Sequence, residues 1–184
     1  MASCNNYALA GLSKSCDPNV GGIKVVYIAP VDDVSAITID DTTASSSTHM
    51  VSAITMVTGK KFKEYYFRKN TGSMTSTLNI SEEGSNYIST EVSLRFSRME
   101  TEKRMEMRAL ALNEMVVIVK DSNNKYWLLG SKDDYVSANA GGGETGTNRE
   151  DSNAYTITLS CESTEWPYEV PSSVITSDII DFNA

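Results

Sequence analysis

Residues 88–130 constrain the fold more than any other part of the chain. Polar and apolar residues alternate over 90–96, and this period of two is typical of a half-buried strand. The unbroken apolar run 115–119 is rich in β-branched residues and predicts a strand buried on both faces. Turn residues follow at 121–124, and 126–129 then forms a returning strand. This stretch contains no recognisable arrangement of catalytic residues.

A helix is predicted between the first two of these strands, over about residues 98–113. Ser97 and Glu100 have the spacing of a capping box at its start, and Asn113 is expected to end it in the left-handed conformation. The residues expected to form its buried apolar face, at i, i+4 and i+7, are Met105, Ala109 and Leu112. The residues expected to face water are Glu102, Lys103, Glu106 and Arg108.

The rest of the chain reads as further strands, with an N-terminal arm and long loops. Strands are predicted at 23–29, 34–39, 51–57, 62–68, 73–80 and 155–160, with a short last strand in 174–180 and an extended edge segment at 165–171. Residues 1–19 are expected to form an arm, and 131–153 the longest loop. The chain of 184 residues therefore predicts a single, mainly β domain with one main helix.

Charge and cysteine content narrow the class of function. The net charge of −8 argues against a nucleic-acid-binding surface, because lysine and arginine lead such binding. The start of the chain does not resemble a signal peptide, and no apolar run is long enough for a membrane span, so no membrane partner is expected. Cys4, Cys16 and Cys161 are expected to be reduced thiols, with a Cys4–Cys16 bridge as the less favoured alternative.

Several residues invite a chemical interpretation, and each has a simpler structural one. Gly141, Gly143 and Gly146 match G-x-G-x-x-G but lie between polar segments, so we predict a flexible loop and no dinucleotide site. His49 is the only histidine and lies in a Ser/Thr-rich segment without a nucleophile elbow, so catalysis is not expected. One histidine and scattered cysteines also exclude the common zinc spacings.

The acidic, sulfur-containing and aromatic clusters are likewise interpreted as structural. The pairs at 32–33, 40–41 and 133–134 lack the calcium-loop pattern and are expected to be solvated turn residues. Helical spacing places the methionines on a core face: Met99, Met105, Met107 and Met115. Tyr65, Tyr66 and Phe67 lack the basic surroundings of a base-stacking site. We therefore predict no catalytic, cofactor-binding or metal-binding residue.

Three segments together resemble a known class of virion proteins. They are DPNVGGIKVVYIA at 17–29, MVVIVKDSNNKYWLLG at 115–130 and NREDSNAYTITL at 148–159. In this order and spacing they resemble virion structural proteins of phages that infect Bacteroidota, including the crAss-like group, of the tail-tube or tail-ring type. The resemblance extends from about residue 17 to residue 170.

This resemblance implies a tail-tube-like β-sandwich with one flanking helix, which assembles into a homo-oligomeric ring or tube around the DNA channel. The implied partners are other copies of the chain in six-fold or twelve-fold rings, adjacent tail or connector rings, and genomic DNA that passes without specific binding. The implied location is the virion tail, with assembly in the host cytoplasm. By the same resemblance, the inter-subunit contacts are expected from 2–19, 40–50 and 131–153.

Other functions remain open from the sequence. The chain is also compatible with a head-tail connector or tail terminator ring. A monomeric β-sandwich that binds carbohydrate or another surface is a further alternative. Exposure of Trp127 or Trp166 would favour that binding module, because aromatic side chains form platforms for sugars. We expect both tryptophans to pack in the core.

Overall fold

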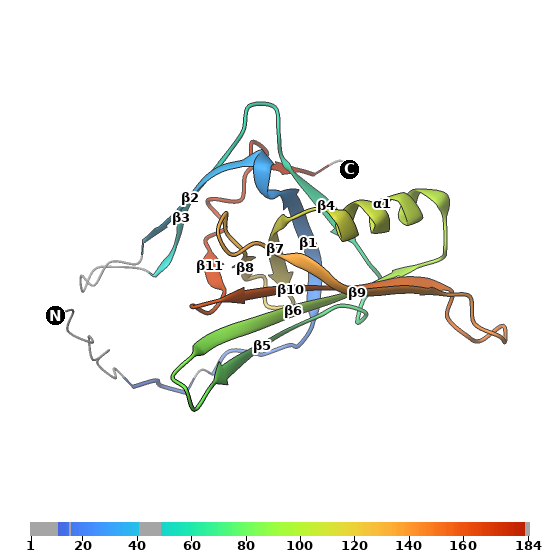
Figure 1. Cartoon of the computed structure of the whole chain (residues 1–184), viewed down its shortest axis with the longest axis horizontal. Helices are drawn as coiled ribbons and strands as arrows, with labels where there is room; N and C mark the ends of the chain where they lie inside the picture. Colours follow the sequence, from blue (N-terminus) through green and yellow to red (C-terminus); the bar gives the residue numbers. More distant parts are fainter. Residues whose placement is uncertain (1–10, 15, 41–48, 183–184) are drawn as a thin grey trace.

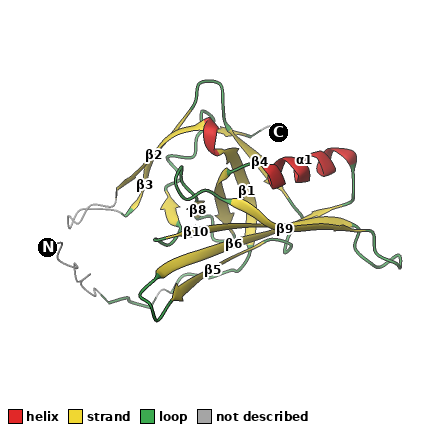
Figure 2. Ribbon diagram, viewed as in Figure 1, coloured by secondary structure: helices red, strands yellow, loops and turns green. Residues whose placement is uncertain are grey.

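The computed structural model describes residues 11–14, 16–40 and 49–182 and has two sheets packed face to face, one α-helix and a projecting hairpin (Figures 1 and 2). The elements in chain order are β1 (Ile23–Pro30), the 3₁₀ helix η1 (Val31–Asp33), β2 (Val34–Asp40), β3 (Met50–Met56), β4 (Phe62–Tyr66), β5 (Ser73–Ile80), β6 (Asn86–Ser97), α1 (Thr101–Leu112), β7 (Met115–Asp121), β8 (Tyr126–Leu129), β9 (Ser137–Glu144), β10 (Ala154–Ser163), β11 (Tyr168–Val170) and β12 (Ile180–Asp181). The mainly β class with one α-helix is confirmed.

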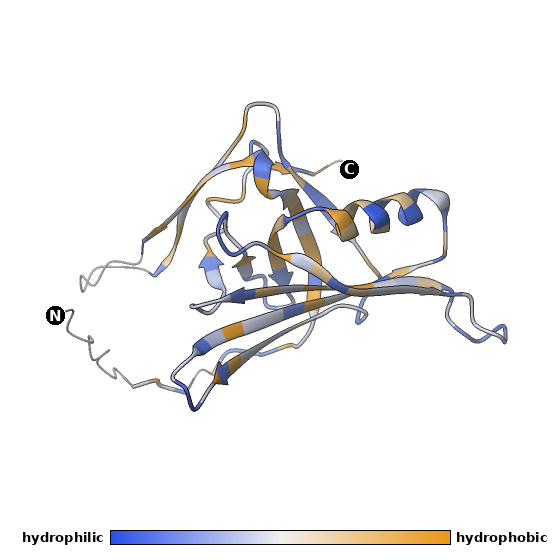
Figure 3. Cartoon of the chain, viewed as in Figure 1, coloured by the Kyte–Doolittle hydropathy of each residue, from blue (hydrophilic) through white to orange (hydrophobic). Residues whose placement is uncertain are grey.

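The first sheet has six strands in the order β11-β8-β7-β1-β4-β12, and its centre is fully buried. Every residue from 115 to 119 is buried, as the apolar run predicted. Alternate residues of β7 enter two separate cores: Val117 and Val119 face one, and Val116 and Ile118 face the other. Figure 3 shows the hydrophobic residues concentrated on these central strands. The six-stranded sheet is therefore the middle layer of the molecule.

One core lies between this sheet and a second, four-stranded sheet of order β5-β6-β10-β9. Val92 and Leu94 of β6 and Ile157 and Leu159 of β10 point into it. The other core lies beneath the β2–β3 hairpin, where Val34 and the rest of the hairpin's inner face cover the opposite side of β1 and β7. The hairpin leans away from the body on the side opposite α1 (Figure 1).

The start of α1 differs from the prediction of a capping box at Ser97. Ser97 remains the last residue of β6 and pairs with Ala154, and the helix begins at Thr101 after Glu100, with no side-chain cap. Asn153 holds the intervening backbone, since its carbonyl oxygen accepts from Arg98 N–H at 2.7 Å and its Oδ1 accepts from the next N–H. Because Ser97 pairs with β10, it belongs to strand β6 and does not cap the helix.

The end of α1 and its buried face also differ from the prediction. Asn113 has φ −101°, so the helix ends in extended and not left-handed backbone. Leu110 is buried, and Met107 packs against the core beside it. The expected apolar face was wrong: Met105 is 62 % and Leu112 is 74 % exposed. The helix is therefore rotated so that Leu110 anchors it and the residues expected inside point outward.

The prediction of a long loop over 131–153 was wrong for the middle of that range. Residues 137–144 form β9, which pairs antiparallel with β10 from Ala154↔Glu144 to Ser160↔Ser137.

Near the C-terminus, the predicted last strand is reduced to Ile180–Asp181, because turns occupy most of 174–179. The extended edge segment is confirmed, since β11 is the end strand of the six-stranded sheet. The arm is described at 11–14 and 16–19, where every residue is exposed.

Candidate functional site

The polar residues that the sequence singled out and the structure describes do not meet in one pocket. His49 directly precedes β3, is exposed and has φ +50°. Among the described residues, no three His, Cys, Asp or Glu side chains form a group that could hold a metal ion. Asp33 forms an ion pair with Lys60 at 3.1 Å, and the Asp133–Asp134 pair lies in a turn whose N–H groups donate to Ser131 Oγ. Asp41 lies outside the described residues.

The predicted flexible loop at Gly141 and Gly143 was wrong, because both residues belong to β9. Gly141 pairs with Ile157 and Gly143 with Tyr155. A side chain at position 143 would meet Tyr155 and Met99 at under 3 Å, so the glycine permits the strand to lie close to these residues. Gly146 follows in a turn with φ +69°. No helix begins in the described segment 145–153 that follows these glycines.

The tryptophans and cysteines divide between core and surface. Trp127 packs against the core and donates its Nε1–H to Asp121 Oδ2 at 3.1 Å, as a packed tryptophan should. Trp166 is 52 % exposed, so the expectation of core packing was wrong for it. Cys16 is an exposed free thiol and Cys161 a buried one. Cys4 lies outside the described residues.

The methionines and the aromatic triplet divide in the same way. Met115 is 1 % exposed and Met107 packs on the core, as expected, whereas Met105 is on the surface. Tyr65 packs against the core, and its hydroxyl donates to Glu106 Oε2 at 2.9 Å. Burial and this carboxylate together raise the pKa of the Tyr65 hydroxyl. Tyr66, next in the chain, is exposed.

The outer face of the four-stranded sheet, the face turned away from the core, has a side-chain pattern of its own. Many of its polar positions carry hydroxyl side chains in rows that follow the strand register. Ser73, Ser93 and Thr158 form one row, and Thr75, Ser160 and Ser137 belong to the next, in which Glu91 lies between Thr75 and Ser160. Ser93 and Thr158 exchange a hydrogen bond across strands at 3.2 Å. Strand alternation also places four charged residues on this face: Glu91, Arg95, Glu144 and Glu162. Arg95 and Glu144 form an ion pair at 2.5 Å.

The same sheet ends in two strands whose outer edges pair with no other strand of the described residues. These are β5 on one side and β9 on the other. Leu78 and Ile80 of β5 are 48 % and 72 % exposed. An unpaired strand presents a row of free N–H and C=O groups that can pair with another chain. The sheet can therefore be extended at both edges.

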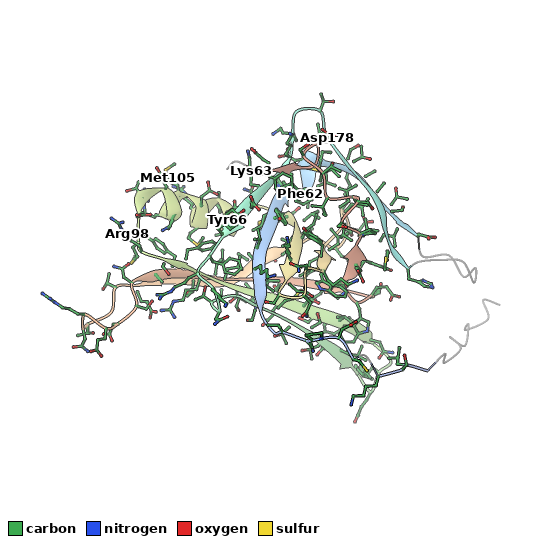
Figure 4. All side chains as sticks on the ribbon, turned by 180° about the vertical axis from the view of Figure 1, so that it is seen from behind. Phe62, Lys63, Tyr66, Arg98, Met105 and Asp178 are labelled. Carbon is green, nitrogen blue, oxygen red and sulfur yellow. The ribbon has the colours of Figure 1, made fainter. Side chains whose placement is uncertain are left out.

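The outward face of α1 combines cationic and apolar side chains. Arg104, Met105, Arg108 and Leu112 line one shallow depression on it. Neither arginine forms an ion pair with any residue that the structure describes, although Lys103 on the inner side pairs with Glu100 at 2.9 Å. Figure 4 shows Met105 on the helix and Arg98 beneath its start, at one end of the molecule.

A groove of about 240 Å³ lies between the β2–β3 hairpin and the strands β8, β10 and β11. Its apolar wall includes Ile39, Leu128 and Trp166, and the acidic residues along it are Asp134 and Glu165. No lysine or arginine of the described chain lines it. Cys161 is among the residues that line the groove, and burial raises the pKa of its thiol to about 11. The groove is thus apolar with an acidic border.

A second cleft, of about 560 Å³, lies between α1 and the turn before β4 and contains three lysines. Each lysine is already engaged by the chain. Lys60 pairs with Asp33, Lys63 pairs with Asp181 at 2.7 Å, and Lys61 donates to the Ser177 carbonyl at 2.6 Å. Carboxylates therefore neutralise two of the three lysines, and a backbone carbonyl engages the third.

Charge is segregated between two parts of the molecule. Residues 60–69 and 95–108 contain ten of the 16 lysines and arginines but only four of the 24 acidic residues. The hydrogen bond between Tyr65 and Glu106 joins these two segments in space. The region around β4 and α1 is therefore basic although the protein is acidic overall. Our sequence reasoning missed this segregation, and also the hydroxyl rows, which the serine and threonine at alternate positions of 73–80, 89–97 and 154–160 would have signalled.

The comparisons with known proteins leave the family open. No protein-family model, curated protein or solved structure matches this chain. Within the described ranges, no helix combines the length and apolarity needed to cross a bilayer.

Proposed function

We propose that this protein is a structural subunit of a bacteriophage tail that forms a homo-oligomeric ring or tube around the DNA channel. The observation that carries the proposal is the outer face of the four-stranded sheet, which is rich in hydroxyl side chains, has one cation and is bounded by two open edges. The sequence segments that resemble tail-tube and tail-ring proteins support the same assignment.

Open edges supply a physical route to a closed ring. β5 of one copy and β9 of the next can pair, so that successive four-stranded sheets join into one barrel and no edge remains. The exposed Leu78 and Ile80 at the β5 edge would lose their contact with water in such a junction.

The hydroxyl face suits a channel through which DNA must pass. Of the four charged residues assigned to this face, Arg95 is the one cation, and Glu144 pairs with it. Hydroxyls offer weak, exchangeable hydrogen bonds, whereas lysine and arginine would hold phosphates with an affinity that grows with each contact. We therefore place this face toward the lumen. Tube, connector and terminator rings share this requirement, and the order of symmetry, six-fold or twelve-fold, is open.

The test is the assembly state of the purified protein, measured by light scattering after size exclusion and by negative-stain imaging of the same fractions. Closed rings or tubes with an open channel are expected. Ile80→Lys places a charge on the β5 edge and should reduce ring formation, whereas Val57→Lys, at an exposed apolar position between β3 and β4, should not. A 20.1 kDa monomer at all concentrations, with no ring in the images, would contradict the proposal.

One observation favours a second candidate function, a carbohydrate- or surface-binding module. Trp166 is 52 % exposed at the border of the groove, where an aromatic ring can stack on a sugar. A glycan array discriminates the two functions. Binding that is lost in Trp166→Ala would favour the module, and the packed Trp127 is not a suitable control because it supports the fold. Lys132→Ala, at an exposed position near the groove, is the matched surface control.

A further inference from the structure

We propose that the outward face of α1 on one copy docks into the groove beside the β2–β3 hairpin of the next copy. The occupant of the groove is thus a second copy of this chain. The inference rests on the proposed ring function and adds to it a second pair of contacting surfaces, besides the β5 and β9 edges.

The helix face has the composition of a contact surface, and no other part of the described chain covers it. Met105 and Leu112 expose 62 % and 74 % of their surface, and Arg104 and Arg108 flank them. Scattered apolar residues are common on surfaces, but here two of them share a face with two arginines that have no ion-pair partner in the described chain. Methionine and arginine are enriched at the centres of protein interfaces.

The groove offers the complementary chemistry. Ile39 and Trp166 are exposed beside it, and its charged lining residues are the acidic Asp134 and Glu165. Neither carboxylate forms an ion pair with a residue that the structure describes. An apolar and cationic helix face therefore meets an apolar and anionic groove, so both charge and hydrophobicity match.

The two surfaces lie toward opposite ends of the molecule. α1 is at one end of the long axis, and the hairpin and β11 lie toward the other (Figure 1). A contact between two different surfaces of identical subunits is heterologous and repeats from copy to copy, giving a ring where the rotation closes. A two-fold dimer through α1 would instead place arginines against arginines. The position of the surfaces therefore favours a repeating assembly over an isolated dimer.

The test exchanges the charges on the two surfaces. Arg104→Glu with Arg108→Glu, and separately Asp134→Lys with Glu165→Lys, should each weaken self-association at least about 30-fold in sedimentation analysis. The chain with all four changes should assemble again, because each pair is restored with reversed sign. Arg68→Glu with Lys69→Glu makes the same charge change on exposed residues away from the helix face and should retain assembly.

Each result decides the inference. Unchanged assembly of either two-residue variant, equal loss in the Arg68 and Lys69 control, or failure of the four-residue variant to recover would overturn the docking model while wild-type rings still support the tail function. A wild-type protein that never assembles would overturn both proposals. Thermal unfolding of every variant shows whether loss of assembly reflects loss of the fold.

Discussion

Replacing Leu110 with alanine tests how α1 is attached to the sandwich. Leu110 is 3 % exposed and is the one residue of α1 that is buried, so it anchors the helix in the core shared with β6 and β10. Truncating a buried leucine to alanine lowers the free energy of unfolding by about 3 kcal/mol, because transfer energy is lost and a cavity is left behind. With a urea dependence of about 2 kcal/mol per molar, the unfolding midpoint should fall by roughly 1.5 M.

The same helix contains the matched control. Leu112 is 74 % exposed, so Leu112→Ala removes the same atoms without opening a cavity and should change the unfolding free energy by less than about 0.5 kcal/mol. Both variants are unfolded in urea at submicromolar concentration, followed by circular dichroism, so that self-association contributes little. A cost for Leu112→Ala equal to or above that for Leu110→Ala would refute the orientation of α1. It would restore the buried face that the sequence pattern predicted.

Three further perturbations have directions fixed by the structure. Gly130→Ala should lower the unfolding free energy by about 2 kcal/mol or more in urea titrations, because φ is +83° and the new Cβ would lie 2.9 Å from a methyl group of Val136. Stability should fall above about pH 10, by about 1.4 kcal/mol per pH unit for each of Tyr27 and Tyr65. Burial raises both pKa values, so the unfolded state loses these protons first. Cys161 should react with iodoacetamide at pH 8 at least about 100-fold more slowly in the folded than in the unfolded protein, measured by peptide mass spectrometry, because its pKa is raised to about 11.

Each of these expectations has a control within the chain. Gly59 has φ +80° with no atom within 4 Å of an added Cβ, so Gly59→Ala should cost only the backbone strain, about 1 kcal/mol. Tyr65→Phe should lower the alkaline slope by about 1.4 kcal/mol per pH unit, and an unchanged slope would refute the assignment to Tyr65. Cys16 is exposed and should be labelled in the folded protein. Equal labelling of Cys161 would mean that its thiol is not enclosed.

The strands were largely predictable because their sequence pattern and their burial have the same cause. Residues 115–119 are apolar at every position because both faces of β7 meet a core. The helix was less predictable. Met105 and Leu112 have helical spacing whether they face the core or a second protein, and periodicity alone does not distinguish the two. The capping box at Ser97 was overridden because a register with β10 satisfies its backbone.

Strand β9 and the candidate surfaces required the tertiary structure. Glycine has low strand propensity, so 141–143 resembles a loop until β10 is seen to pair with it. The basic segments 60–69 and 95–108 could be counted in the sequence, but their union into one region depends on the packing of β4 beside α1. The acidic groove is assembled from β2, β8 and the segment before β11, which no local pattern connects.

The composition of the outer sheet face is easier to explain in an assembly than in an isolated domain. A monomer gains solubility from lysine and glutamate at exposed strand positions, yet β5, β6 and β10 place Ser73, Thr75, Ser93 and Thr158 there. In a ring, charges of one sign on this face would approach their counterparts on other copies across the lumen and would repel one another. Cations would in addition retain the phosphates of passing DNA. Hydroxyl groups at these positions add neither cost, and ten of the 16 lysines and arginines are found instead in 60–69 and 95–108, where the proposed docking would neutralise Arg104 and Arg108.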